Sequence, residues 1–243
     1  MTYGWPPQAF RVSEASARRQ GRLAFAFLAI ERGSVVTRDE LVEVLWPSAP
    51  PPAWEAALNA LISKLRRALN PVSTGIETAV GCYRLRLPDG SWVDLEEAAR
   101  ALHEAEGLLR ANRPQDAYMD AVIASSILRR PFLPGEDGDW AERQRRSLSE
   151  SRLRALDCVV QVMAWHREFE LAVKNAEEAV ALDPIRESGY QRLMRIYAAS
   201  GNRPAALLAF ERCRRVLAEE LGIQPSTETT AVRESVLSER LQS

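Results

Sequence analysis

Polar and basic side chains gather on one face of the helix that residues 53–69 are expected to form. At about 100° per residue, one stripe of this helix consists of Asn59, Ser63 and Arg67, with Lys64 and Arg66 beside it. Amide and hydroxyl groups can hydrogen-bond to phosphate oxygens or base edges, and cations release counterions from a polyanion. The pattern therefore indicates a phosphate-rich partner. The alternative is a solvated helix end, where cations interact favourably with the helix dipole without any ligand.

Two more cations, Arg84 and Arg86, are expected on one face of a β-hairpin over residues 76–87. Hydrophobic and polar residues alternate in this run, and Gly81 provides the turn. The opposite face carries Tyr83, Leu85 and Leu87. The hairpin would therefore extend the positive surface of the preceding helix.

Three arginines, Arg18, Arg19 and Arg22, open the first predicted helix, which stops at Gly33. The spacing R-x-x-x-R occurs in some cyclic-dinucleotide sites, so these arginines are candidate phosphate or nucleotide contacts. A pattern this short also arises often by chance, and the nucleotide interpretation is the weaker one.

No combination of residues points to catalysis or to metal binding. The histidines and cysteines are His103, His166, Cys82, Cys158 and Cys213. They form no C-x-x-C pair and have no other metal-ligand spacing. Adjacent acids such as Glu96 and Glu97 point about 100° apart on a helix, so they cannot converge on one substrate atom. We expect no enzyme activity, no metal and no cofactor, and we interpret the cysteines as reduced.

Charge is unevenly distributed along the chain. Residues 1–93 hold 11 Lys and Arg against 8 Asp and Glu, and the remainder holds 21 against 25, although the net charge is only -1. The first part therefore suits a polyanionic partner and the second does not. No run of 18 apolar residues occurs, and the first 25 residues carry four arginines. We expect a cytoplasmic protein with no membrane partner.

We expect the first part of the chain to form an arm followed by one compact domain. Residues 1–17, with a short strand over residues 9–13, form the arm. Residues 18–92 hold the first helix, a short helix that ends at Leu45, the helix with the basic stripe and the hairpin. The short helix begins with the capping box Thr37-Arg-Asp-Glu40.

We expect residues 93–243 to form an all-helical domain. The run from Arg167 matches the run from Gly201 at an offset of 34 residues, the period of the tetratricopeptide unit. A weaker copy surrounds Asn112, and Pro131–Asp139 reads as an inserted loop. Five tryptophans are expected mostly as packing residues, namely Trp46, Trp54, Trp92, Trp140 and Trp165. The fold class is therefore mainly α: a winged helix-turn-helix with a small hairpin wing, followed by tetratricopeptide-like repeats.

Five segments carry a family resemblance. They are Asp39-Glu-Leu-Val-Glu-Val-Leu-Trp46, Ile62-Ser-Lys-Leu-Arg-Arg-Ala-Leu69, Gly81-Cys-Tyr-Arg-Leu85, Leu133-Pro-Gly-Glu136 and Glu220-Leu-Gly-Ile-Gln-Pro-Ser226. In this order they resemble the bacterial transcriptional activator family that includes the Streptomyces antibiotic regulatory proteins. The winged helix of that family is of the response-regulator output type.

The resemblance implies that residues 53–69 enter the major groove of double-stranded promoter DNA, that the hairpin touches the minor groove or backbone, and that dimers read direct repeats. The DNA contacts would come from Asn59, Ser63, Lys64, Arg66, Arg67, Arg84 and Arg86. In this hypothesis the repeat domain forms a homodimer and contacts RNA polymerase or another regulatory protein. Two alternatives stay open: a tetratricopeptide-like interaction adaptor, and a sensor of a small-molecule effector whose winged helix is degenerate.

Overall fold

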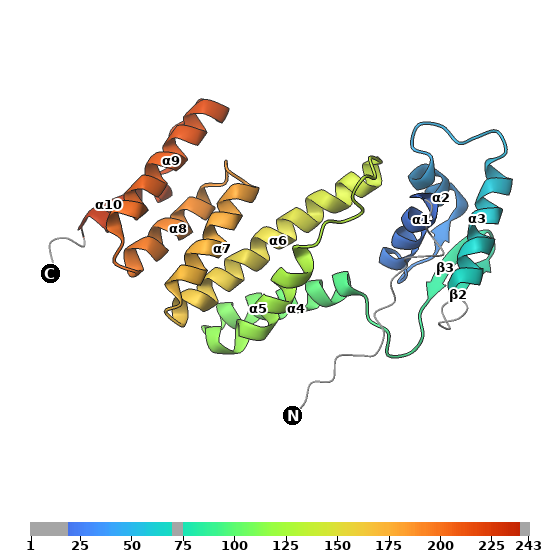
Figure 1. Cartoon of the computed structure of the whole chain (residues 1–243), viewed down its shortest axis with the longest axis horizontal. Coiled ribbons are helices and arrows are strands. Elements are labelled where there is room, and N and C mark those ends of the chain that lie inside the picture. Colours follow the sequence, from blue (N-terminus) through green and yellow to red (C-terminus); the bar gives the residue numbers. More distant parts are fainter. Residues whose placement is uncertain (1–18, 70–74, 239–243) are drawn as a thin grey trace. The chain divides into compact units, whose positions relative to one another are not determined.

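The structure is a computed structural model that describes residues 19–69 and 75–238 (Figure 1). It is mainly helical with one small sheet, which confirms the predicted fold class. The chain divides into two compact units, Met1–Val93 with Phe132–Arg145, and Asp94–Pro131 with Arg146–Ser243. The predicted arm, its strand at residues 9–13 and Arg18 lie outside the described residues.

The N-terminal unit contains three complete helices and a three-stranded antiparallel sheet among its described residues. Its elements are α1 (Arg19–Ile30), β1 (Val36–Thr37), α2 (Arg38–Leu45), α3 (Trp54–Leu69), β2 (Gly75–Ala79) and β3 (Cys82–Arg86). The strands lie in the order β1-β3-β2, and Ala79 pairs with Cys82 across the hairpin. The chain turns through Val80 and Gly81, both at positive φ. A two-residue type I′ turn requires this backbone at both central positions.

The capping box at the start of α2 forms as the sequence predicts. The Glu40 N–H donates to Thr37 Oγ1 at 3.2 Å, and the Glu40 carboxylate accepts from the Thr37 N–H at 2.7 Å. These two bonds satisfy donors that have no partner within the helix. The hydrogen bonds from the backbone and the hydroxyl of Thr37 lower the pKa of Glu40.

Residues Phe132–Arg145 pack in the N-terminal unit, although they separate two helices of the other unit in the sequence. Trp140 packs edge-to-face against Phe27, with ring centroids 5.2 Å apart, and also contacts Phe132 at 5.8 Å. Its side chain is only 7% exposed. The run that reads as an inserted loop therefore contributes Phe132 and Leu133 to the core of the winged helix, and Trp140, directly after the run, is buried in that core.

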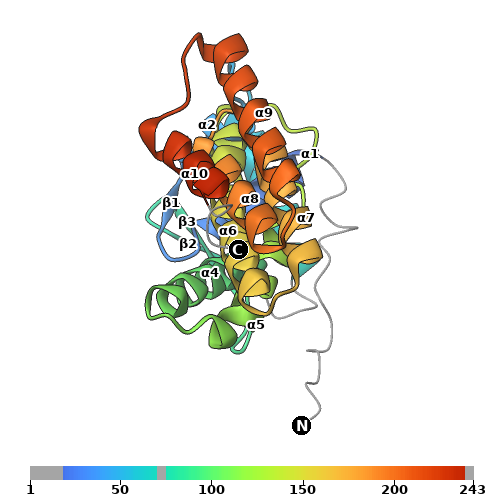
Figure 2. The same cartoon turned by 90° about the vertical axis from the view of Figure 1, so that its left-hand side faces the viewer.

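The C-terminal unit is all-helical over its described residues. Its helices are α4 (Asp94–Arg110), α5 (Pro114–Leu128), most of α6 (Asp139–Trp165), α7 (Phe169–Leu182), α8 (Glu187–Ala199), α9 (Arg203–Leu221) and α10 (Thr227–Ser238). Figure 2 looks onto the end of the unit where α8, α9 and α10 lie against one another. Helix α7 begins at Phe169 and α9 begins at Arg203, so the two starts are 34 residues apart, as predicted.

Three helix-helix turns in this unit share one backbone geometry. The residues in the left-handed region at these turns are Asn112, Arg167 and Gly201, with φ of 57°, 61° and 80°. The next N–H in each turn reaches back to a carbonyl of the preceding helix: Arg113 to Leu108, Glu168 to Met163 and Asn202 to Tyr197. Five residues after the left-handed position stands a fully buried alanine: Ala117, Ala172 or Ala206. The weaker copy around Asn112 is thus the same Schellman-type turn.

Most of the five tryptophans pack as predicted, since Trp46, Trp54 and Trp140 contact the core of the N-terminal unit, and the other two do not. Trp92 is 50% exposed and Trp165 is 54% exposed. Trp92 lies between β3 and α4, and Trp165 ends α6, where its ring packs edge-to-face on His166. Both occur where a helix or strand has just ended or is about to begin, so fewer neighbours surround them than in a helix interior.

The cysteines of the C-terminal unit are buried thiols. Burial raises the pKa of Cys158 to about 12 and that of Cys213 to about 11. Over residues 19–69 and 75–238, no three His, Cys, Asp or Glu side chains gather as metal ligands would. None of the helices described is both long and apolar enough to cross a membrane.

Candidate nucleic-acid interface

Helix α3 directs its predicted polar stripe outward. Its buried side consists of Leu58, Ile62, Leu65 and Leu69. Ser63, Lys64 and Arg67 are exposed on the other side. Within the described part of the chain, these three side chains have no hydrogen bond or ion pair. They are therefore available to an external partner.

Asn59 lies in the same stripe but has a neighbour from another helix. Its Oδ1 accepts a hydrogen bond of 3.4 Å from Arg38, whose guanidinium also lies 5.8 Å from the centroid of the Trp54 ring. The Asn59 amide group keeps its two N–H donors. Arg38 joins the candidate interface although the sequence pattern did not single it out. Its position directly after the Thr37 cap was the available signal, because it places Arg38 in the first turn of α2.

Arg66 differs from its neighbours because its guanidinium binds the wing. Its Nε donates to the carbonyl oxygen of Ile76 at 2.8 Å, and an Nη donates to the hydroxyl of Thr78. Both acceptors belong to β2, so Arg66 holds α3 against the hairpin. This role competes with the DNA contact predicted for it, since the same donors cannot serve both partners at once.

The two hairpin arginines also have partners within the unit. Tyr83 and Leu85 are buried, which leaves Arg84 and Arg86 on the opposite face, as the alternation predicts. Arg86 pairs with Glu77 across the strands at 2.8 Å, with both side chains more than half exposed. The Arg84 guanidinium donates to the Ser34 carbonyl at 3.4 Å. An exposed ion pair is weak in water, so a phosphate could displace Glu77.

The candidate nucleotide arginines meet an internal carboxylate. The Nε atom of Arg19 lies 2.7 Å from Oε2 of Glu136, and an Nη atom of Arg22 lies 3.6 Å from Oε1. Glu136 itself is only 1% exposed. The hydrogen bond that Arg19 donates to Glu136, together with the charge of that carboxylate, raises the pKa of Arg19. These two arginines therefore neutralise a buried acid of the Leu133-Pro-Gly-Glu136 segment. The third, Arg18, lies outside the described residues.

Two family models match the chain. The model described as Transcriptional regulatory protein, C terminal, matches residues 17–84, and the model described as Bacterial transcriptional activator domain matches residues 93–237. The chain belongs to the bacterial transcriptional activator domain family. The resemblance found in the sequence is thereby confirmed.

Members of this family that resemble the chain are named as regulators. Regulatory protein AfsR of Streptomyces coelicolor is 30% identical over 244 residues, which cover 96% of this chain and 23% of the relative. Transcriptional regulatory protein MoaR1 of Mycobacterium tuberculosis is 27% identical over 230 residues, which cover 89% of this chain and 71% of the relative. The chain thus spans about a quarter of the length of AfsR.

A solved structure has the same fold as this bacterial transcriptional activator domain chain. It is Mycobacterium tuberculosis EmbR in complex with a low affinity phosphopeptide, with a TM-score of 0.84 and 25% sequence identity. The match covers 91% of this chain and 60% of the EmbR chain.

Proposed function

We propose that this chain is a transcription regulator that binds double-stranded promoter DNA through the exposed face of α3. The observation that carries the proposal is the set of unpartnered side chains, Ser63, Lys64 and Arg67, on a helix whose other side is fully buried. A helix of this kind fits the major groove, where cations meet phosphates and hydroxyl or amide groups meet phosphates or base edges.

The proposal assigns different tasks to the basic residues. Lys64 and Arg67 contact phosphates, and the free amide of Asn59 is the group best suited to read a base. Arg66 positions the wing instead of contacting DNA directly. Arg84 and Arg86 at the wing contact the backbone by exchanging their weak internal partners for phosphate.

The C-terminal unit serves protein contacts in this proposal, including homodimer formation and contact with RNA polymerase or another regulator. Its repeated helical hairpins support this assignment, because stacked units of this kind present extended surfaces to peptides and helices. The sequence also leaves it with an excess of acidic residues, which disfavours direct contact with DNA.

The decisive experiment is capture of genomic DNA fragments by the purified chain, followed by titration of a captured fragment at several salt concentrations. Counterion release predicts that the logarithm of affinity falls linearly with the logarithm of salt concentration. The variant Lys64→Ala/Arg67→Ala should flatten this slope by about 2 and weaken binding to all fragments.

The matched control is Arg110→Ala/Lys174→Ala, which removes the same charge from exposed positions of the C-terminal unit. It should leave both slope and affinity unchanged. An equal loss of DNA affinity in the two double variants would mean that net charge alone drives binding. A chain that captures no DNA even at low salt would instead support the adaptor hypothesis, and a ligand that raises its thermal midpoint would support the sensor.

A further inference from the structure

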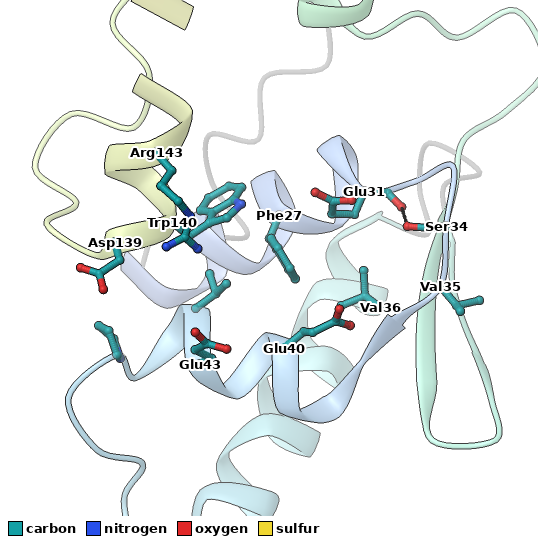
Figure 3. A pocket seen from close by; sticks show the side chains of 12 residues that line it. Phe27, Glu31, Ser34, Val35, Val36, Glu40, Glu43, Asp139, Trp140 and Arg143 are labelled. Atoms are coloured by element: carbon teal, nitrogen blue, oxygen red, sulfur yellow. Dashed lines mark hydrogen bonds between the residues drawn. The ribbon is translucent and has the colours of Figure 1, made fainter. Parts of the chain in front are cut away.

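The N-terminal unit has a pocket that no residue of α3 or of the hairpin lines. This pocket, of about 290 Å³, lies between the end of α1, the segment around β1, the length of α2 and the start of α6 (Figure 3). Its apolar lining consists of Phe27, Val35, Val36, Val44, Pro47 and Trp140. The volume lies at the lower limit for a small-molecule site, so the pocket suits one or two side chains of a peptide better than a nucleotide.

Carboxylates dominate the polar lining of the pocket. They are Glu31, Glu40, Glu43 and Asp139, with Arg143 as the one cation among the residues that line it. Glu40 is occupied by the Thr37 cap. For the carboxylates of Glu31, Glu43 and Asp139, no hydrogen bond or ion pair is found within the described residues. The pocket therefore has an excess of negative charge, in contrast to the basic surface of α3.

Trp140 brings an unsatisfied hydrogen-bond donor to the wall of the pocket. The residue is more than nine-tenths buried, yet its indole Nε1 has no acceptor in the described structure. Figure 3 places the ring between Arg143 and Phe27, with its nitrogen on the Phe27 side. A buried N–H donor without an acceptor is energetically unfavourable. Because Nε1 is closed to solvent, a peptide carbonyl beside Phe27 reaches it through a small shift of the Trp140 ring on binding.

We propose that this pocket docks a basic, partly apolar peptide segment of a protein partner. An arginine or lysine of the segment pairs with Glu43 and Asp139, and an adjacent aliphatic side chain contacts Phe27 and Trp140. Charge complementarity selects this occupant, because an acidic or neutral peptide would leave the carboxylates uncompensated. No residue of α3 lines the pocket, so the winged helix could bind DNA through α3 and a protein through the pocket at the same time.

The test uses the full chain and a defined probe, an acetylated and amidated pentapeptide of Leu, Arg, Leu, Arg and Leu. Binding is followed by calorimetry and by the indole N–H signal of Trp140 in the ¹⁵N–¹H NMR spectrum, assigned with Trp140→Phe. We expect saturable binding and a downfield shift of that signal as the N–H gains an acceptor. The variant Glu43→Gln/Asp139→Asn should raise the dissociation constant at least tenfold.

Three controls make the outcome decisive. A peptide with Glu in place of Arg should not bind, and one with Ser in place of Leu should bind at least several-fold more weakly. Glu104→Gln, at an exposed acid of α4, should bind the probe like the unmodified chain. The proposal is overturned if Glu43→Gln/Asp139→Asn binds the probe unchanged while its thermal midpoint is retained, or if the Trp140 signal does not move. DNA affinity of this variant should be retained, so failure here leaves the DNA proposal intact.

Discussion

The guanidinium of Arg66 donates from Nε to the carbonyl oxygen of Ile76 at 2.8 Å, which joins α3 to the first strand of the wing. Its sequence neighbour Arg67 is exposed and has no partner in the described structure. Two adjacent arginines therefore differ in role because consecutive helical positions point about 100° apart. Only one of the two directions faces β2.

Replacing each of these arginines in turn should separate stability from DNA affinity. Arg66→Ala should lower the free energy of unfolding by about 1–2 kcal/mol, since it removes charge-assisted bonds to Ile76 and Thr78. Arg67→Ala should change it by less than about 0.5 kcal/mol but should reduce the salt slope of DNA binding by about 1. Urea unfolding and fluorescence anisotropy measure the two effects. Unchanged stability of Arg66→Ala would contradict the positioning role.

Removing the cations of the Glu136 ion pairs should lower the stability of the chain more than removing Glu136 itself. These pairs join Glu136 to Arg19 and Arg22. Arg19→Ala/Arg22→Ala leaves a carboxylate that is 1% exposed without its cations, which is strongly unfavourable. Glu136→Leu leaves two arginines that are more than half exposed and can be solvated. We expect the double arginine variant to have the lower thermal midpoint. Adding Glu136→Leu to it should restore part of the loss, and no restoration would argue against the ion pairs.

The wing tip holds a valine at φ of 50°, a conformation that β-branched residues rarely adopt. Val80→Asn should stabilise the N-terminal unit by about 1 kcal/mol, because Asn-Gly is the preferred pair in a type I′ turn. Ala79→Asn, one residue earlier in β2, should not stabilise it. Chemical denaturation of the three proteins compares them, and a loss of stability in Val80→Asn would show that the turn has another geometry.

Opposite substitutions at two equivalent turns, those of Gly201 and Arg167, should change the stability of the C-terminal unit in opposite directions. Gly201→Ala forces a Cβ into the left-handed region at φ of 80° and should cost about 1–2 kcal/mol. Arg167→Gly relieves that strain at the matching turn, so it should stabilise the C-terminal unit. The gain is reduced by loss of the Arg167 contact with the Phe169 ring, 5.7 Å from its centroid. Thermal unfolding followed by far-ultraviolet circular dichroism measures both, and a gain in Gly201→Ala would refute the equivalence.

Thiol labelling at pH 8 should distinguish the three cysteines. The pKa values of Cys158 and Cys213, about 12 and about 11, keep both in the unreactive protonated form below pH 10. Cys82 is only half buried at the wing. Iodoacetamide should therefore modify Cys82 first in the native chain and all three cysteines in urea, as read by mass spectrometry. Rapid native labelling of Cys158 would contradict its burial in the repeat core.

Local patterns in the sequence were sufficient to predict most secondary structure. The Thr37 cap, the apolar face of α3, the alternation around Tyr83 and the offset between Arg167 and Gly201 all depend on residues close together in the chain. Each pattern fixes a backbone geometry with little help from distant parts, because caps, helical periods and turns are local interactions. The same patterns also placed Ser63, Lys64 and Arg67 on the exposed face of their helix.

Tertiary packing alone decided which partner each polar group finds. The sequence could not show that Arg66 reaches β2, that Arg19 and Arg22 neutralise Glu136, or that Trp140 completes the core beside Phe27. These contacts join residues far apart in the chain, and their existence depends on how the elements pack. A charged side chain is available for an external ligand only when folding has brought no internal partner to it, so availability is a property of the folded chain.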